Sequence, residues 1–209
     1  MKKVSCVLTL LGIWVLMGPM HADCRAAAVR QANLAEIARD AEIIFAGTCC
    51  AARLAYDEQT GQQAWFFSFT VQEMLKGPDN DTITVKLNKT LVDMKQVKTY
   101  APGEEVVLFL ADESRLGYSS PIGLAQGRFR IRYDISGAKT VTNGFNNRKL
   151  FRGMTNVVSR RTVAGSADRE SVSGLLNQKQ GPVAYRLFRL LTKAVLFNLE
   201  NQQQGKDNP

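Results

Sequence analysis

Histidine is almost absent from this 209-residue sequence, and the only one is His21. It lies near the end of an N-terminal segment in which two lysines precede an uncharged, mostly apolar run over residues 4–17. A basic start, an apolar stretch too short to span a bilayer and a small final residue are typical of a secretory signal peptide. We predict a signal peptide over 1–22, cleaved near Ala22, and a periplasmic or secreted protein; an uncleaved anchor is the alternative.

Cleavage would leave a chain without histidine and lower the net charge of +8 by two. Without histidine there is no Ser-His-Asp or Cys-His arrangement and no common His-containing zinc site. A P-loop and a dinucleotide fingerprint are also missing. We therefore expect no enzyme, no cofactor and no metal. A histidine-free hydrolase is a further hypothesis, with a serine of the glycine-punctuated 118–127 loop activated by a lysine.

Four cysteines are too few to hold together a fold that lacks a core. Cys24, Cys49 and Cys50 would remain after cleavage, in an oxidising compartment where a disulfide is expected. Cys49 and Cys50 are neighbours, so on a strand they point to opposite faces and do not suit a bond to each other. We predict that Cys24 pairs with one of them, with a slight preference for Cys50.

Short runs with a period of two dominate the middle of the chain, and turn residues separate them. This pattern predicts a mainly β fold, a small antiparallel OB-like barrel over 23–159. A capping box of Asn33 and Glu36 predicts a short helix over 34–41 at the side of the barrel. The run 106–110 is apolar throughout, as in a strand that is covered on both faces. The large side chains expected in the core are Phe67, Phe69, Val107, Phe109, Phe129 and Ile131.

The C-terminal part changes composition twice. Residues 160–181 are rich in Arg, Ser, Gly and Gln, which favours a linker. From Pro182 an amphipathic helix is expected over 182–200, followed by a polar tail over 201–209. Docking of this helix on the barrel is the preferred interpretation; a dimer interface and a membrane surface are the alternatives.

Arg128, Arg130 and Arg132 alternate with apolar residues on one predicted strand. Period two places their guanidinium groups on one face, about 7 Å apart, a spacing that suits phosphates or sulfates. The alternative is a solvated outer face. No nucleic-acid partner is expected, because Phe129 and Tyr133 point to the opposite face and cannot stack bases beside the arginines.

Three blocks resemble the netrin-like module of tissue inhibitors of metalloproteinases: residues 40–47 (DAEIIFAG), 69–77 (FTVQEMLKG) and 103–110 (GEEVVLFL). Together with the stretch 118–131, which is similar to exported bacterial proteins of this type, they imply an OB-type barrel. Inhibitors of that family begin with a Cys-x-Cys pair that chelates the protease zinc. Here Arg25 and Ala26 follow Cys24, so this zinc-binding role does not transfer to Cys24.

These observations predict an exported binding module that presents loops to an extracytoplasmic protein partner, with a metalloprotease as the candidate implied by the resemblance. Binding residues on such folds concentrate in loops, here 54–64 and 112–127. The alternative is a protein that binds anionic polymers or lipids through the three arginines.

Overall fold

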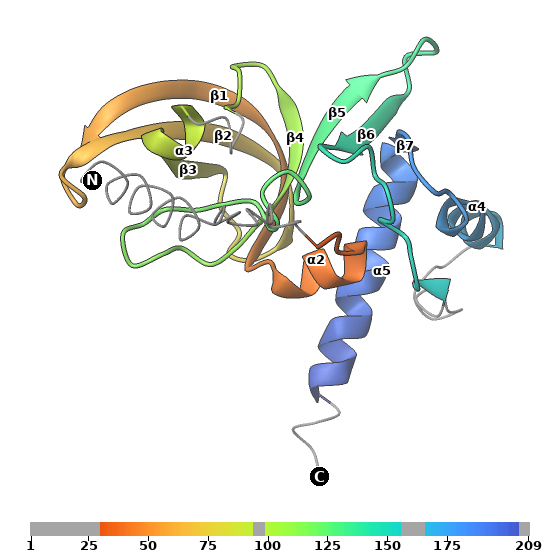
Figure 1. Cartoon of the computed structure of the whole chain (residues 1–209). Helices are drawn as coiled ribbons and strands as arrows, with labels where there is room; N and C mark the ends of the chain where they lie inside the picture. Colours follow the sequence, from red (N-terminus) through yellow and green to blue (C-terminus); the bar gives the residue numbers. More distant parts are fainter. Residues whose placement is uncertain (1–29, 94–98, 156–165, 205–209) are drawn as a thin grey trace, which may run out of the picture. The chain divides into compact units, whose positions relative to one another are not determined.

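The computed structural model describes residues 30–93, 99–155 and 166–204, and the fold below is that of the compact unit that begins at Gln31. The predicted signal peptide and Cys24 lie outside the described residues. In chain order the elements are α2 (Leu34–Asp40), β1 (Ile43–Asp57), β2 (Gln62–Lys76), β3 (Thr82–Asn88), α3 (Lys89–Asp93), β4 (Glu105–Leu110), β5 (Arg128–Tyr133), β6 (Lys139–Asn143), α4 (Ser166–Leu176), β7 (Val183–Ala184) and α5 (Tyr185–Gln204) (Figure 1).

The strands form one antiparallel sheet in the order β3-β2-β1-β4-β5-β6-β7. The mainly β class is confirmed, but the sheet is not closed into the predicted OB-like barrel, because β3 and β7 lie at opposite ends of the sheet and do not pair. Closure needs the two terminal strands to hydrogen-bond to each other with the tilt and stagger of a barrel, and a very short terminal strand offers few groups for such pairing. Here β7 has only two residues, whereas β3 has seven.

The long β1–β2 hairpin bends strongly (Figure 1). Its pairing shifts register at three places along β1, one of them between Ala46 and Gly47. Such bulges bend a strand and increase its twist. At Gly47 a Cβ atom would lie 2.7 Å from the Thr70 carbonyl oxygen, so the bend requires glycine there.

Two hydrophobic cores lie on opposite faces of β4. The first, which we call the helical core, joins one face of β1, β4, β5 and β6 to the helices and contains Val107 and Phe109. The second, the hairpin core, lies inside the bent β1–β2–β3 sheet and contains Val106, Leu108 and Leu110. The prediction that this strand is covered on both faces is confirmed, and all six large side chains predicted for the core are buried.

Helix α2 begins at the predicted capping box. The Asn33 side chain accepts a hydrogen bond from the Glu36 backbone N–H, and the Glu36 carboxylate accepts one from the Asn33 N–H. Leu34 and Ile37 enter the helical core. Helix α5 packs against α2, and its Phe188 ring lies 4.7 Å from the Phe129 ring and 6.3 Å from the Phe109 ring, centroid to centroid.

Docking of the C-terminal helix is therefore confirmed, but its predicted start is wrong. Val183 and Ala184 pair with β6 as strand β7, so the helix begins at Tyr185 and continues to Gln204. The linker predicted over 160–181 also differs, since helix α4 occupies 166–176 and buries Val172 and Leu175 in the helical core. In the sequence, the spacing of these two apolar residues among small ones is only a weak indication of this helix. In the described parts of the chain, no helix is both long and apolar enough to cross a bilayer.

Substitution of Phe109 tests the role of β4 as the strand on which the helices pack. Phe109 is fully buried, and we expect Phe109→Ala to lower the free energy of unfolding by about 3–5 kcal/mol, through lost burial and the cavity left behind. Chemical denaturation measures this change. Phe197→Ala, at a position 45% exposed on α5, is the matched control with an expected cost below about 1 kcal/mol; equal costs would contradict the packing described.

Candidate functional site

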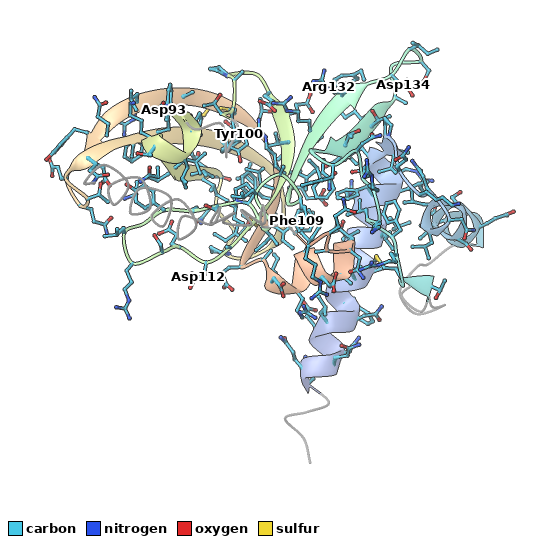
Figure 2. All side chains as sticks on the ribbon, in the orientation of Figure 1. Asp93, Tyr100, Phe109, Asp112, Arg132 and Asp134 are labelled. Carbon is cyan, nitrogen blue, oxygen red and sulfur yellow. The ribbon has the colours of Figure 1, made fainter. Side chains whose placement is uncertain are left out.

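The three arginines singled out in the sequence do not form a free cationic stripe. Arg128 is 7% exposed; its Nη2 lies 2.9 Å from Glu104 Oε1 and donates to the Thr99 carbonyl at 2.8 Å. Arg130 Nε lies 2.8 Å from the same carboxylate oxygen. One glutamate thus bridges two arginines, and of the three only Arg132 points outward from β5 without an ion pair in the described structure (Figure 2).

The Arg128 guanidinium lies 4.0 Å from the centroid of the Tyr100 ring, which is buried in the hairpin core. Burial raises the pKa of the Tyr100 hydroxyl far above its ordinary value. Arg128 therefore ties the segment before β4 to β5 and covers the end of the hairpin core. The alternative of a solvated face is therefore wrong for Arg128, while anion binding by the three arginines stays a prediction.

A groove of about 430 Å³ lies beside Glu104, Arg130, Arg132 and Tyr133. Its charges are balanced, because Glu105 at its rim is ion-paired with Lys139 and accepts a hydrogen bond from the Tyr133 hydroxyl. The Lys139 contact holds the pKa of Glu105 below its usual value. Both glutamates of this groove are paired, and of its two arginines only Arg132 has no ion pair in the described structure, so the groove offers an anion one available cation rather than a stripe of three.

The two loops predicted to bind a partner are joined in the structure. The Gln59 side-chain amide donates to the Arg115 carbonyl at 3.1 Å. The Tyr118 hydroxyl donates to Thr60 Oγ1 at 3.4 Å. The β1–β2 turn, 57–60, and the segment 114–118 therefore form one surface, which we call the loop surface.

A buried ion pair lies beneath the loop surface. Lys86 Nζ is 2.9 Å from Asp57 Oδ2, with both side chains 9% exposed, and it also donates to Gln59 Oε1 at 3.2 Å. The Lys86 ammonium lies 4.9 Å from the Tyr118 ring centroid. Gly117 has φ +71°, and its Cβ position is 3.0 Å from Lys86 Nζ, so a larger residue there would be strained and crowded.

Hydrogen bonds from Thr60 and then from Lys86 lower the pKa of the Asp57 carboxyl. Sequence reasoning missed this pair because Lys86 falls at a polar position of an alternating strand. With Thr82 and Thr84 it looks solvent-facing. The only indication of this ion pair in the sequence is the excess of polar residues in the two loops that cover Lys86.

An apolar groove of about 630 Å³ borders the loop surface, between the end of β3 with α3 and residues 114–120. Its lining residues include Leu87, Leu91, Leu116 and Tyr118. Leu116 is 49% exposed and Leu91 is 36% exposed. Solvent-exposed leucines in a concave site of this size are typical of binding sites.

Around Ser119, the described residues do not place a free lysine ammonium as a base, as the hypothesis of a lysine-activated serine requires. Ser119 is buried, and its backbone N–H donates to the Lys86 carbonyl. The Lys86 ammonium is committed to Asp57 and Gln59, so it is not placed as a base. Among the residues that the structure describes, no three His, Cys, Asp or Glu side chains are grouped to hold a metal ion.

Cys49 and Cys50 point to opposite faces, as predicted. Cys49 is buried in the hairpin core, where burial raises the pKa of its thiol, whereas Cys50 is exposed. No disulfide is found within the described ranges. Because Cys24 lies outside them, its pairing with either cysteine stays a prediction, and only Cys50 is accessible to a segment outside the sheet.

Comparison with protein-family models and with curated proteins finds no match to this chain.

The Glu104 pairs give a prediction about stability. Glu104→Gln removes the charge that compensates the buried Arg128, and we expect it to lower the free energy of unfolding by about 3 kcal/mol. Glu42→Gln, at an exposed position, is the control and should cost less than about 0.5 kcal/mol. The comparison is made by urea denaturation at neutral pH. A Glu104 variant as stable as its control would show that the pair is not structural.

The lowered pKa of Asp57 gives a prediction about pH. Since the pKa of this carboxyl is lower in the folded than in the unfolded protein, its contribution is present above the unfolded value of about 4 and is lost as pH falls through the folded value. Wild type should therefore exceed Asp57→Asn in stability at neutral pH, and the difference should shrink below about pH 4.

Denaturation series at several pH values measure this difference. Asp112→Asn is the control, because the exposed Asp112 side chain has no hydrogen bond or ion pair in the described structure (Figure 2). A difference between wild type and Asp57→Asn that stayed constant with pH would contradict a role for the ionised carboxylate.

Proposed function

We propose that this protein is a non-enzymatic binding module that acts outside the cytoplasm and presents its loop surface to a protein partner. The observation that carries this proposal is the apolar groove beside Leu91 and Leu116. It keeps large apolar side chains in solvent, which folding alone does not require.

The scaffold beneath the groove supports a binding role because it is held in place before any partner arrives. The Lys86–Asp57 pair and the hydrogen bonds from Gln59 and Tyr118 tie the two loops to β3. A preformed surface loses less conformational entropy on association than a mobile one. Buried ion pairs are a costly way to gain stability, and they are better suited to fixing one geometry.

The charges around the groove indicate the kind of partner. Glu58, Asp112 and Glu113 are exposed in the two loops, and Arg115 beside Leu116 is the one exposed cation there, in a chain whose net charge is +8. A complementary partner segment would carry an apolar side chain for the groove and basic residues for the excess of acidic side chains in these loops. Given the resemblance to metalloproteinase inhibitors, an exported metalloprotease is the first class of partner to assay.

The proposal is tested by capture from the exported fraction with immobilised protein, in which Leu116→Asp is compared with wild type. A charge in the groove should weaken binding of the captured protein at least about tenfold, as loss of an apolar anchor does. Ile135→Asp is the matched control, because Ile135 is fully exposed on the β5–β6 turn, away from the groove.

Binding of the captured protein is then quantified for each variant, and any protease recovered is assayed for inhibition. Equal binding by wild type and Leu116→Asp would contradict the loop surface as the binding site. Capture of lipid or polysaccharide alone would contradict a protein partner.

A further inference from the structure

A second groove, of about 540 Å³, lies between the segment 148–152 and the segment 177–180. Four of its lining residues are cations: Arg148, Lys149, Arg152 and Lys179. All four are exposed, and the described residues that line the groove include no acidic side chain. We call it the basic groove.

These four cations differ from others on the surface. Arg130, Lys139, Arg189 and Lys193 each contact a carboxylate. In the described structure, none of the four side chains in the basic groove has an ion pair. Like charges gathered in one concavity repel each other and focus a positive potential, which an anionic ligand relieves.

The walls of the basic groove are fixed to each other by the backbone. The Lys149 N–H donates to the Lys179 carbonyl at 3.3 Å, and the Gly181 N–H donates to the Asn146 carbonyl at 2.8 Å. The buried Asn147 side chain donates to the Val141 and Gly181 carbonyls, both at 2.9 Å. Asn147 has φ +55°, a conformation that asparagine adopts more readily than most residues.

The same contacts decide which groups can bind a ligand. The backbone N–H groups of Arg148, Leu150 and Arg152 donate within the loop, and that of Lys149 donates to the Lys179 carbonyl on the opposite wall. A ligand would therefore be held by side chains. Arginine presents a planar set of donors that matches two oxygens of a phosphate at once.

The groove also has an apolar part. Phe151 is 3% exposed and Leu176 is partly buried, and both line it. Its volume lies within the range of about 300–1,000 Å³ that is usual for small-molecule sites. It therefore suits a ligand that carries an anionic group and an adjoining apolar part.

We propose that the basic groove binds a phosphate group, held by Arg148 and Arg152 with the two lysines, while the attached apolar part lies over Phe151 and Leu176. The phosphate could belong to a free organic phosphate or to the headgroup of an anionic lipid. This site is independent of the loop surface. It places anion binding in the basic groove rather than at the three arginines of β5, two of which form ion pairs with Glu104.

The first arm of the test uses a soluble probe. Phenyl phosphate and inorganic phosphate are titrated into the full chain by calorimetry, and the ring should make phenyl phosphate bind more tightly. The double variant Arg148→Glu, Arg152→Glu should weaken phenyl phosphate at least about tenfold. Arg132→Glu, an exposed arginine of β5, should change it less than about twofold, and circular dichroism checks that both variants are folded.

The second arm uses vesicles of phosphatidylcholine with and without phosphatidylglycerol, in a sedimentation assay with the same variants. Binding to the anionic vesicles that is lost in the double variant and kept in Arg132→Glu identifies a lipid headgroup, whereas binding of phenyl phosphate alone identifies a free phosphate. If neither probe binds, or if the folded double variant binds both as wild type does, the proposal is wrong. Equal loss in Arg132→Glu would also overturn it.

Discussion

The burial of β4 on both faces is the constraint on which the rest of this structure depends. Phe109 and Val107 on one face receive α2 and α5, while Val106, Leu108 and Leu110 on the other close the bent β1–β2–β3 sheet. A slip of this strand by one residue would exchange its two faces, so that Phe109 would enter the hairpin core and Leu108 would face the helices. Because each core is packed for side chains of a particular size, such an exchange is disfavoured, and β4 fixes the register of its neighbours β1 and β5.

Much of this architecture could be predicted because apolar periodicity reports burial directly. The alternation of Phe67 and Phe69, the continuous run 106–110 and the capping box at Asn33 each describe a local environment, and each prediction held. Sheet closure is not local. It depends on the bulges in β1 and on how the two ends of the sheet meet, and a pattern of period two is the same in an open sheet and in a barrel.

For the candidate sites, too, local features could be predicted from the sequence, whereas contacts between distant residues could not. Sequence alone predicted loops 54–64 and 112–127 as binding loops, which stays a prediction, but it did not indicate that Gln59 and Tyr118 join the two loops or that the Lys86–Asp57 pair lies beneath them. It placed Arg128, Arg130 and Arg132 on one face correctly, but it could not show that Glu104 lies between two of them. Charged residues look solvated in a sequence, and only three-dimensional pairing separates a cation that holds the fold together from one that is available to a ligand.

We propose that paired charges hold the scaffold in place and that the exposed Leu91 and Leu116 of the apolar groove bind a partner. The most direct measurement is hydrogen–deuterium exchange of the full chain with and without the protein that it captures from the exported fraction. The account predicts slower exchange in 87–91 and 114–120 and no change in the β5–β6 turn around Asp134. Protection confined to β5 and its turn, with 114–120 unchanged, would contradict it.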